Sequence, residues 1–469
     1  MQVSIKWLKD YVEIDEPAEK IADRLTMAGV PVERIVRADE GLEKVITGRI
    51  EKITPHPDSD HLLVCQLNMG SAELTQIVTG ASNVREGHIV PVATVGAVLP
   101  DGKKISKGKL RGIPSNGMMC SAGELAIDTE GLPDEQVNGI YILPPDTPVG
   151  VPAAQVLGLD DVILEFELTA NRADCFSVIG IAREVAALTG KSLRMPTIEV
   201  KETAGVRAAD LVSIHIDDKE LCHRFSARVL RDVKVAPTPA WMVDRLRGAG
   251  IRSINNVVDV TNFVMLELGQ PLHAYDYDRI AGHTLTARHA RAGEQLHTLD
   301  DSNRIAVGDE LVIADSEKPA GLAGIMGGLD SEVTDKTTTV VLEAASFHGP
   351  TIRRTARRIG LRSEASGRFE RGVDETETIR AVTRAAQLLT EMDACTVAEG
   401  AIDVNPTPRV PTVLTFRART VAERIGANIP GEWMASALRS LGFIVEEEGI
   451  ETYRVVVPSW RGDVTLMED

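Results

Sequence analysis

Aromatic side chains are scarce in this 469-residue sequence and make up 4% of it. The hydrophobic cores must therefore be built mostly from Val, Ile, Leu and Ala. Hydrophobic residues reach 43% and charged residues 26%, which is the composition of an ordinary globular protein. This balance excludes a disordered or collagen-like chain.

Cysteines are also few: five are scattered along the chain, and no CxxC pair exists. An odd, scattered set fits reduced thiols better than a disulfide framework or a zinc site. No apolar run approaches the length of a membrane span, and the charged N-terminus MQVSIKWLKDYVEID lacks the apolar core of a signal peptide. We therefore expect a cytoplasmic protein with no membrane partner.

Positive charge is in deficit, with 51 Lys plus Arg against 69 Asp plus Glu and a net charge of −18. Such a chain is not expected to coat nucleic acid nonspecifically, so any RNA contact must use a local patch. Residues 353–371 hold such a patch, with seven arginines and two glutamates. Four of the arginines would share one side of a helix, namely Arg353, Arg354, Arg357 and Arg358. Phosphate contact and ion pairing with surplus acids both remain open interpretations.

The length predicts three or four domains, and the pattern along the chain indicates an α+β multidomain architecture. Short β-branched runs between turn residues predict a small all-β barrel over 41–150. The first 40 residues read as two helices that cannot form a core alone, so the barrel is expected to interrupt a small N-terminal domain. Residues 374–392 form the clearest helix, and 413–469 reads as strand, helix, helix, strand, strand.

Three features within one domain predict a small-molecule pocket. His273 is expected on a loop after a helix that carries Thr261 and Asn262 in a strongly apolar run. GLAGIMGG at 321–328 lacks the Lys-Ser/Thr of a P-loop, so its glycines are expected to allow close backbone approach. Glu343 lies inside an apolar strand, where a carboxylate needs a partner or a ligand. Taken singly, each has a structural explanation.

Two acidic motifs could hold a metal ion. HPDSDH at 56–61 is interpreted as a turn rather than a metal site. Asp463 and Asp469 offer the oxygen ligands that Mg²⁺ prefers, but acids at a helix N-terminus explain that spacing better. The sequence stops where a helix is expected to begin, so we expect residue 469 to be a truncation point rather than a natural end.

Long motifs in a fixed order resemble one family, the bacterial phenylalanyl-tRNA synthetase β subunits. The strings that carry this resemblance are HPDSDHLLVCQLN, IVTGASNV, LRGIPSNGMMCSAGEL, TANRADCFSVIGIARE, NNVVDVTNFVMLELGQPLHAYD, GLAGIMGG, VVLEAASF, SEASGRFERGVD and VPSWRGD.

The resemblance implies a domain plan and an activity. An OB-type tRNA-binding barrel would be inserted in an N-terminal domain, followed by an α/β editing domain that hydrolyses mischarged Tyr-tRNA-Phe and a small winged-helix-like domain. The implied ranges are 1–40 with 151–200, 41–150, 205–399 and 405–469.

The resemblance also assigns residues. Glu343 matches the position credited with sensing the tyrosine hydroxyl, and His273 is expected to orient the ester end. Other matching pocket positions are Thr261, Asn262, Gly327, Ser363 and Ala365. The family usually has Thr where this chain has Ser363, which preserves the hydroxyl and removes a methyl group.

Partners and cofactors follow from the same resemblance. An α subunit would complete an α2β2 heterotetramer on tRNA-Phe and carry out ATP-dependent synthesis, with ATP not bound by this chain alone. Asp463 and Asp469 match two of the family's Mg²⁺ ligands, and the remaining ligands would lie beyond residue 469. The alternative to an editing subunit is a noncatalytic tRNA-binding or scaffold fragment.

Overall fold

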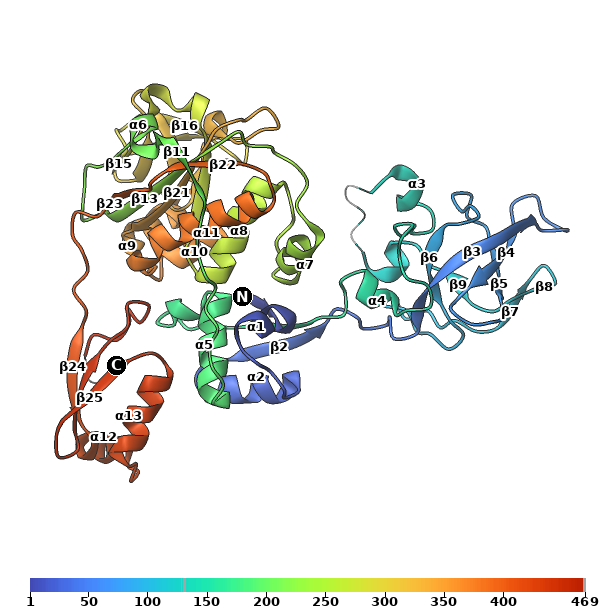
Figure 1. Ribbon diagram of the computed structural model, residues 1–469, viewed down its shortest axis with the longest axis horizontal. Helices are drawn as coiled ribbons and strands as arrows, with labels where there is room; N and C mark the ends of the chain where they lie inside the picture. Colours follow the sequence, from blue (N-terminus) through green and yellow to red (C-terminus); the bar gives the residue numbers. More distant parts are fainter. Residues whose placement is uncertain (128, 130–131, 467–469) are drawn as a thin grey trace. The chain divides into compact units, whose positions relative to one another are not determined.

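The computed structural model describes residues 1–127, 129 and 132–466 (Figure 1). Contacts divide the chain into two compact units, Val36–Ile163 and the combination of Met1–Ile35 with Leu164–Asp469. The first unit is therefore inserted into the second along the sequence. Among the described residues, no helix is both long and apolar enough to cross a bilayer.

The inserted unit is built on a five-stranded antiparallel sheet in the order β5-β4-β3-β6-β9. Its two end strands also contact each other, which curls the sheet into a nearly closed barrel. Ile50, Cys65 and Leu67 are among the buried side chains that fill its interior. The strands are β3 (Val45–Pro55), β4 (Leu63–Asn68), β5 (Thr75–Thr79), β6 (Ile89–Ala93) and β9 (Met118–Met119). The expected all-β barrel is confirmed.

A hairpin and a turn are tied together on this barrel. HPDSDH forms the turn between β3 and β4, as expected, and the Nε2 atom of buried His56 lies 3.0 Å from the carbonyl oxygen of Leu110. Leu110 belongs to the hairpin of β7 (Gly108–Leu110) and β8 (Ile113–Ser115). Short helical segments complete the unit: η1 (Gly123–Leu125), α3 (Asp134–Val137) and α4 (Ala153–Val156).

The N-terminal part of the second unit contains a three-stranded sheet in which β10 lies between β1 and β2. Ser177 caps the start of helix α5, because its hydroxyl accepts a hydrogen bond from the Gly180 amide at 2.9 Å, and Gly190 caps the end of the helix. The elements are β1 (Gln2–Ser4), α1 (Ile5–Tyr11), α2 (Ala18–Met27), β2 (Val32–Arg37), β10 (Val162–Phe166), η2 (Ala173–Cys175) and α5 (Val178–Thr189).

The largest part, from β11 to β23, contains two sheets around one apolar core. One sheet has the order β11-β22-β13-β21-β14, with β23 also paired to β13, and helices α8 and α11 pack against it (Figure 1). The other has the order β12-β15-β18-β19-β20. A separate hairpin joins β16 to β17.

The strands of this part are β11 (Glu202–Arg207), β12 (Ser213–Ile216), β13 (Cys222–Arg231), β14 (Leu272–Asp276), β15 (Thr284–His289), β16 (Gln295–Thr298), β17 (Ser302–Ile305), β18 (Leu311–Ala314), β19 (Pro319–Leu322), β20 (Met326–Gly327), β21 (Val340–Phe347), β22 (Thr396–Glu399) and β23 (Ile402–Val404). Its helices are α6 (Ala208–Leu211), α7 (Ala240–Gly248), α8 (Asn256–Leu268), η3 (Tyr277–Arg279), η4 (Ala281–His283), η5 (Leu329–Ser331), α9 (Gly349–Ile359), α10 (Glu364–Phe369), η6 (Glu375–Glu377) and α11 (Thr378–Glu391).

The C-terminal part has the predicted order of strand, helix, helix, strand, strand. Its sheet order is β24-β26-β25, and Phe416 stacks on Tyr453 in the core at 5.1 Å between ring centroids. The elements are β24 (Val413–Arg417), α12 (Ala418–Ile425), α13 (Gly431–Ser440), β25 (Ile444–Gly449) and β26 (Thr452–Val456).

A buried ionic network joins helix α1 to helix α8. The Glu267 carboxylate has 0% exposed side-chain area and accepts hydrogen bonds from Arg384 at 2.9 and 3.0 Å. The Tyr11 hydroxyl donates to the same carboxylate at 2.5 Å, and Trp7 stacks on Phe263 beside it. Burial of a carboxylate is costly, and here the Arg384 cation and the Tyr11 hydroxyl offset that cost.

We predict that Arg384→Ala destabilises the chain by about 3–5 kcal/mol, because Glu267 would remain buried without its cation. Urea unfolding at pH 7 measures this change. Arg419→Ala, which removes an exposed pair with Glu423, is the matched control and should leave stability unchanged. Equal effects of the two variants would contradict the assignment.

Candidate functional site

The polar side chains predicted to act together meet where β14 pairs with β21. His273 lies opposite Glu343 in this antiparallel pair, and Tyr275 lies opposite Val341. Alternate residues of a strand share a face, so His273, Tyr275 and Glu343 point to the same side of the sheet. The expectation that His273 lies on a loop is wrong, because the chain re-enters the sheet at Leu272 directly after the end of α8 at Gly269.

A cavity of about 260 Å³ opens beside this strand pair. Every residue that the sequence analysis placed in the pocket lines it: Thr261, Asn262, His273, Gly327, Glu343, Ser363 and Ala365. Most of the remaining wall is apolar and includes Leu322, Phe347 and Phe369. The volume lies just below the roughly 300–1,000 Å³ of pockets for drug-sized ligands, so it suits a group of amino-acid size.

Glycines on one wall let other groups approach the backbone closely, as predicted. A Cβ atom on Gly327 would lie 2.3 Å from Cε1 of His273, and one on Gly328 would lie 2.5 Å from the carbonyl oxygen of Ala320. Neither distance is sterically possible without movement. The glycine at 327 therefore gives the His273 ring its place in the wall.

Glu343 is the buried acid of the pocket. Its Oε2 atom accepts a hydrogen bond from the Tyr275 hydroxyl at 2.5 Å, and Tyr275 is its only hydrogen-bond partner among the described residues. Burial raises the pKa of Glu343 to about 7, against the opposing effect of the Tyr275 hydrogen bond. The second carboxylate oxygen is thus available to a ligand hydroxyl. Tyr275 itself was missed from the sequence, although its alternation with His273 in PLHAYD places both on one face of a strand.

His273 is held as a neutral imidazole. Its ring packs edge-on against Tyr275 with 4.5 Å between centroids, and Nε2 is buried with no hydrogen-bond partner among the described residues. Burial lowers the pKa of His273 to about 4, so the ring is uncharged at pH 7. It can hold a water or an ester group by hydrogen bonding but supplies no positive charge.

Two hydroxyls in the wall are already engaged. The Ser363 hydroxyl donates to the Ile325 carbonyl at 2.9 Å and accepts from the Ser366 amide at 3.1 Å. It therefore caps α10 and joins this helix to the glycine segment, residues 321–328. The Thr261 hydroxyl donates to the Val258 carbonyl at 2.7 Å. Neither is paired with a base that would make it a nucleophile.

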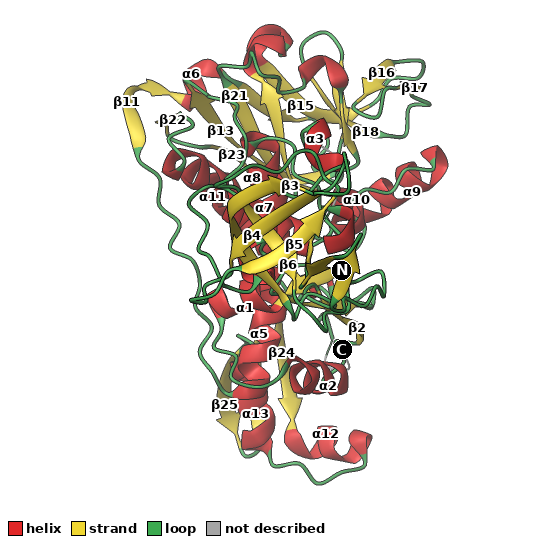
Figure 2. Cartoon of the chain, turned by 90° about the vertical axis from the view of Figure 1, so that its right-hand side faces the viewer, coloured by secondary structure: helices red, strands yellow, loops and turns green. Residues whose placement is uncertain are grey.

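Figure 2 shows helix α9 in the cartoon of the chain. The four predicted arginines lie on this helix and are exposed. The ion-pair interpretation holds for one of the four arginines, and phosphate contact stays a prediction. Arg358 is paired with the buried carboxylate of Glu310, whereas Arg353 and Arg357 have no ion-pair partner among the described residues. Arg354 donates to the Thr351 hydroxyl, which leaves its charge uncompensated.

A second basic segment was missed from the sequence. Residues 103–111, KKISKGKLR, contain five cations and no acid, and this local run was the available signal. Lys103 is paired with Glu124, but Lys104, Lys107 and Lys109 are exposed with no ion-pair partner among the described residues. The segment includes one strand of the barrel's β7–β8 hairpin.

One of the two predicted Mg²⁺ ligands, Asp463, is engaged within the chain. Both oxygens of Asp463 accept hydrogen bonds from Arg461 at 2.8 Å, so a cation already compensates this carboxylate. Asp469 lies outside the described residues. Within the described part of the chain, one cluster has metal-ligand chemistry, namely Asp174, Cys175 and Glu184. The Arg172 guanidinium donates to all three, so this cluster is an ion-pair network.

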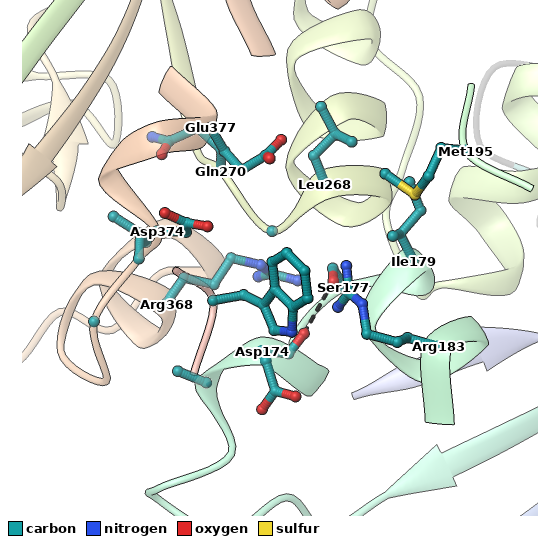
Figure 3. A pocket seen from close by; sticks show the side chains of 15 residues that line it. Asp174, Ser177, Ile179, Arg183, Met195, Leu268, Gln270, Arg368, Asp374 and Glu377 are labelled. Carbon is teal, nitrogen blue, oxygen red and sulfur yellow. Dashed lines mark hydrogen bonds between the residues drawn. The ribbon is translucent and has the colours of Figure 1, made fainter. Parts of the chain in front are cut away.

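A smaller cavity of about 50 Å³ lies between α5, the end of α8 and α10 (Figure 3). Nη2 of Arg368 and Oε1 of Gln270 are buried in its wall without a partner among the described residues. Space of this size and polarity suits a few water molecules. The Gln270 amide also donates to the Ala345 carbonyl at 2.9 Å, so this region supports β21 from outside the larger pocket.

Three family models match the chain in sequence order. They are a putative tRNA binding domain over residues 45–152, a B3/4 domain over 221–394 and a tRNA synthetase B5 domain over 414–469. The barrel belongs to the first, and the pocket lies within the second. These matches place the chain in the class of tRNA-binding aminoacyl-tRNA synthetase subunits.

Curated relatives narrow this class. The phenylalanine--tRNA ligase beta subunit of Moorella thermoacetica is 47% identical over 99% of this chain. That of Clostridium acetobutylicum is 44% identical over 100% of this chain. The chain therefore belongs to the bacterial phenylalanine--tRNA ligase β subunits and corresponds to their N-terminal portion. It spans 57% and 58% of the length of these two relatives.

A solved N-terminal fragment of the phenylalanyl-tRNA synthetase beta-subunit from Pyrococcus horikoshii is 14% identical, with a TM-score of 0.33 over 65% of this chain and 84% of the fragment. A likeness at this level carries no argument about the site.

We predict that Gly327→Ala displaces the His273 ring, because the new Cβ atom would lie 2.3 Å from Cε1 of that ring. Crystal structures of the variant and the wild type measure the displacement. Gly367→Ala is the control, since its Cβ would meet nothing closer than 3.9 Å, and it should leave the His273 ring in place. An unmoved His273 ring in Gly327→Ala would contradict the close contact assigned to Gly327.

Proposed function

We propose that this chain binds tRNA-Phe and hydrolyses tyrosine wrongly esterified to it, as the editing part of a phenylalanyl-tRNA synthetase β subunit. One observation carries the proposal. Glu343 presents a buried carboxyl with one available oxygen inside a mostly apolar pocket of amino-acid size.

Selection of the mistake follows from the difference between two side chains. Tyrosine and phenylalanine differ by one hydroxyl, and an apolar synthetic site rejects an added hydroxyl only weakly. A second site that hydrogen-bonds this hydroxyl leaves a buried polar group unsatisfied when phenylalanine enters instead. Glu343 supplies such a group, and Phe347 and Phe369 supply an apolar wall for the ring.

Hydrolysis in this proposal uses a positioned water. The pocket hydroxyls of Thr261 and Ser363 are engaged in structural hydrogen bonds, so neither serves as a covalent nucleophile. The water adds to the ester carbonyl, the bond to the ribose oxygen breaks, and that oxygen takes a proton. Neutral His273 and nearby backbone groups orient the water and the ester end.

The remaining assignments concern the whole enzyme. An α subunit would complete an α2β2 assembly in the cytoplasm and use ATP and Mg²⁺ to make Phe-tRNA-Phe. This chain would contribute tRNA binding through Arg353, Arg354 and Arg357 on α9 and through the barrel. Arg358 is the weakest of the four predicted phosphate contacts, because Glu310 already engages it.

A noncatalytic tRNA-binding fragment is the second candidate. The uncompensated cations on α9 and in residues 103–111 favour it, since they serve binding without chemistry. An inert pocket would have no need for the unengaged oxygen of Glu343, and the two candidates differ in what happens when this carboxyl is removed.

We predict that Glu343→Ala slows deacylation of Tyr-tRNA-Phe at least tenfold, because a hydrogen bond to a charged group contributes about 1.5–3 kcal/mol. Phe-tRNA-Phe, which lacks the hydroxyl, should be hydrolysed slowly by wild type and variant alike. Exposed Glu332→Ala is the control variant. No deacylation by the folded wild-type chain would favour the binding fragment.

We predict that Arg353→Gln combined with Arg357→Gln weakens tRNA binding and lowers the slope of log affinity against log salt by roughly one to two, since each phosphate contact releases a counterion. Binding titrations across a salt series measure the slope. A charge-matched control, Arg207→Gln with Arg419→Gln, removes two exposed arginines that are paired with acids. Identical slopes for both double variants would rule out a specific role for α9.

A further inference from the structure

We propose that Tyr275 is a positioning residue for specificity: its hydroxyl occupies Oε2 of Glu343 and so reserves the other oxygen for the hydroxyl of the substrate. This inference rests on the proposed function of the pocket. It concerns how the pocket distinguishes two side chains, and it is tested separately from hydrolysis.

The geometry of the strand pair produces this contact. His273 lies directly opposite Glu343, so Tyr275, two residues further along β14, is the diagonal neighbour of Glu343 on the same face. Diagonal pairs are within reach of long aromatic side chains. The Tyr275 hydroxyl donates to Oε2 at 2.5 Å, and the residue is 2% exposed.

The position of the phenol is fixed from two sides. The His273 ring packs edge-on against the Tyr275 ring with 4.5 Å between centroids, and His273 is itself confined by Gly327. Tyr275 also packs in the apolar core on this same face of the sheet. Because the Tyr275 ring is fixed, its hydroxyl holds the Glu343 carboxyl in one orientation.

A fixed donor on one oxygen has a chemical consequence for recognition. A carboxylate accepts hydrogen bonds, whereas a protonated carboxyl also donates one. With Oε2 engaged by Tyr275 and the group ionised, Oε1 offers only an acceptor, which a phenolic hydroxyl satisfies and a phenylalanine ring does not. Without Tyr275, the carboxyl would be freer to rotate and to retain its proton, and it would reject phenylalanine less strongly.

The ionisation of Glu343 depends on few neighbours. Burial raises its pKa to about 7, and the Tyr275 hydrogen bond is the opposing influence. His273 on β14 is neutral near pH 7, and Cys222 on β13 has its thiol pKa raised by burial and by the Glu343 charge. Glu364 at the pocket wall is paired with Arg368 at 2.8 Å.

The sign of the pH effect follows from this arrangement. Tyr275 favours the ionised form, so its removal raises the pKa of Glu343 further. Discrimination that requires the carboxylate grows as pH rises through that pKa. The pH at which discrimination between tyrosine and phenylalanine is half-maximal must therefore rise when the Tyr275 hydroxyl is lost.

Tyr275→Phe tests the inference with non-hydrolysable probes, 3′-deoxy-3′-(L-tyrosylamino)adenosine and its phenylalanyl counterpart. Their dissociation constants are measured by calorimetry with the full chain from pH 5.5 to 8.5. Wild type should prefer the tyrosyl probe about tenfold or more above pH 7. Tyr275→Phe should lose most of this preference at pH 7 and recover part of it at higher pH.

Two controls keep the result interpretable. Tyr277→Phe removes a hydroxyl two residues away that donates to the Leu211 carbonyl at 3.1 Å, and it should behave as wild type. The Glu343→Gln variant has no carboxyl to titrate at this position. Adding Tyr275→Phe to it should therefore not change how the preference between the two probes varies with pH. The inference would be overturned if Tyr275→Phe changed neither the preference for the tyrosyl probe nor the pH midpoint of that preference. It would also be overturned if Tyr277→Phe lost the preference to the same extent.

Failure of the proposed function is distinguishable from failure of this inference. If wild type shows the pH-dependent preference but does not deacylate Tyr-tRNA-Phe, the hydrolysis proposal fails and the role of Tyr275 in recognition stands. If wild type prefers neither probe at any pH, the role assigned to Tyr275 is overturned whether or not deacylation occurs.

Discussion

The burial of the Glu343 carboxyl is the constraint on which the pocket depends. All eight side chains of β21 are buried, and Glu343 is the ionisable residue among them. A buried carboxylate is costly unless it is hydrogen-bonded, and the described part of the chain supplies one donor, the Tyr275 hydroxyl. Burial raises the pKa of Glu343 to about 7 against the Tyr275 hydrogen bond, and its second oxygen stays available. A ligand hydroxyl can supply the hydrogen bond that the second oxygen of Glu343 lacks.

The surrounding elements hold this carboxyl in a shaped space. Gly327 admits the His273 ring, His273 confines Tyr275, and the Ser363 hydroxyl joins α10 to the glycine segment across the cavity. Helix α8 serves two regions at once, because Thr261 faces the pocket while Glu267 binds Tyr11 of the N-terminal part. Docking of the N-terminal part and the shape of the pocket therefore share one helix.

The sequence predicted local patterns well and long-range pairing poorly. The barrel, the five elements of the C-terminal part and the set of pocket residues followed from periodicity, turn residues and motif resemblance. His273 was misplaced because GQP reads locally as a loop, whereas its strand exists only through pairing with β21. The bond between Tyr275 and Glu343 joins residues 68 apart, and that between Arg358 and Glu310 joins residues 48 apart. Strand register and contacts between residues far apart in the sequence depend on the tertiary structure, and local sequence patterns do not predict them.

The most direct test is a crystal structure of the chain soaked with 3′-deoxy-3′-(L-tyrosylamino)adenosine. We expect the tyrosyl ring to lie against Phe347 and Phe369, with its phenolic oxygen within about 2.6–3.2 Å of the free Glu343 oxygen and the amide end toward His273. A probe bound in the opposite direction, with its amide at Glu343, or bound outside this cavity, would contradict the assignment of Glu343 as the sensor of the tyrosine hydroxyl.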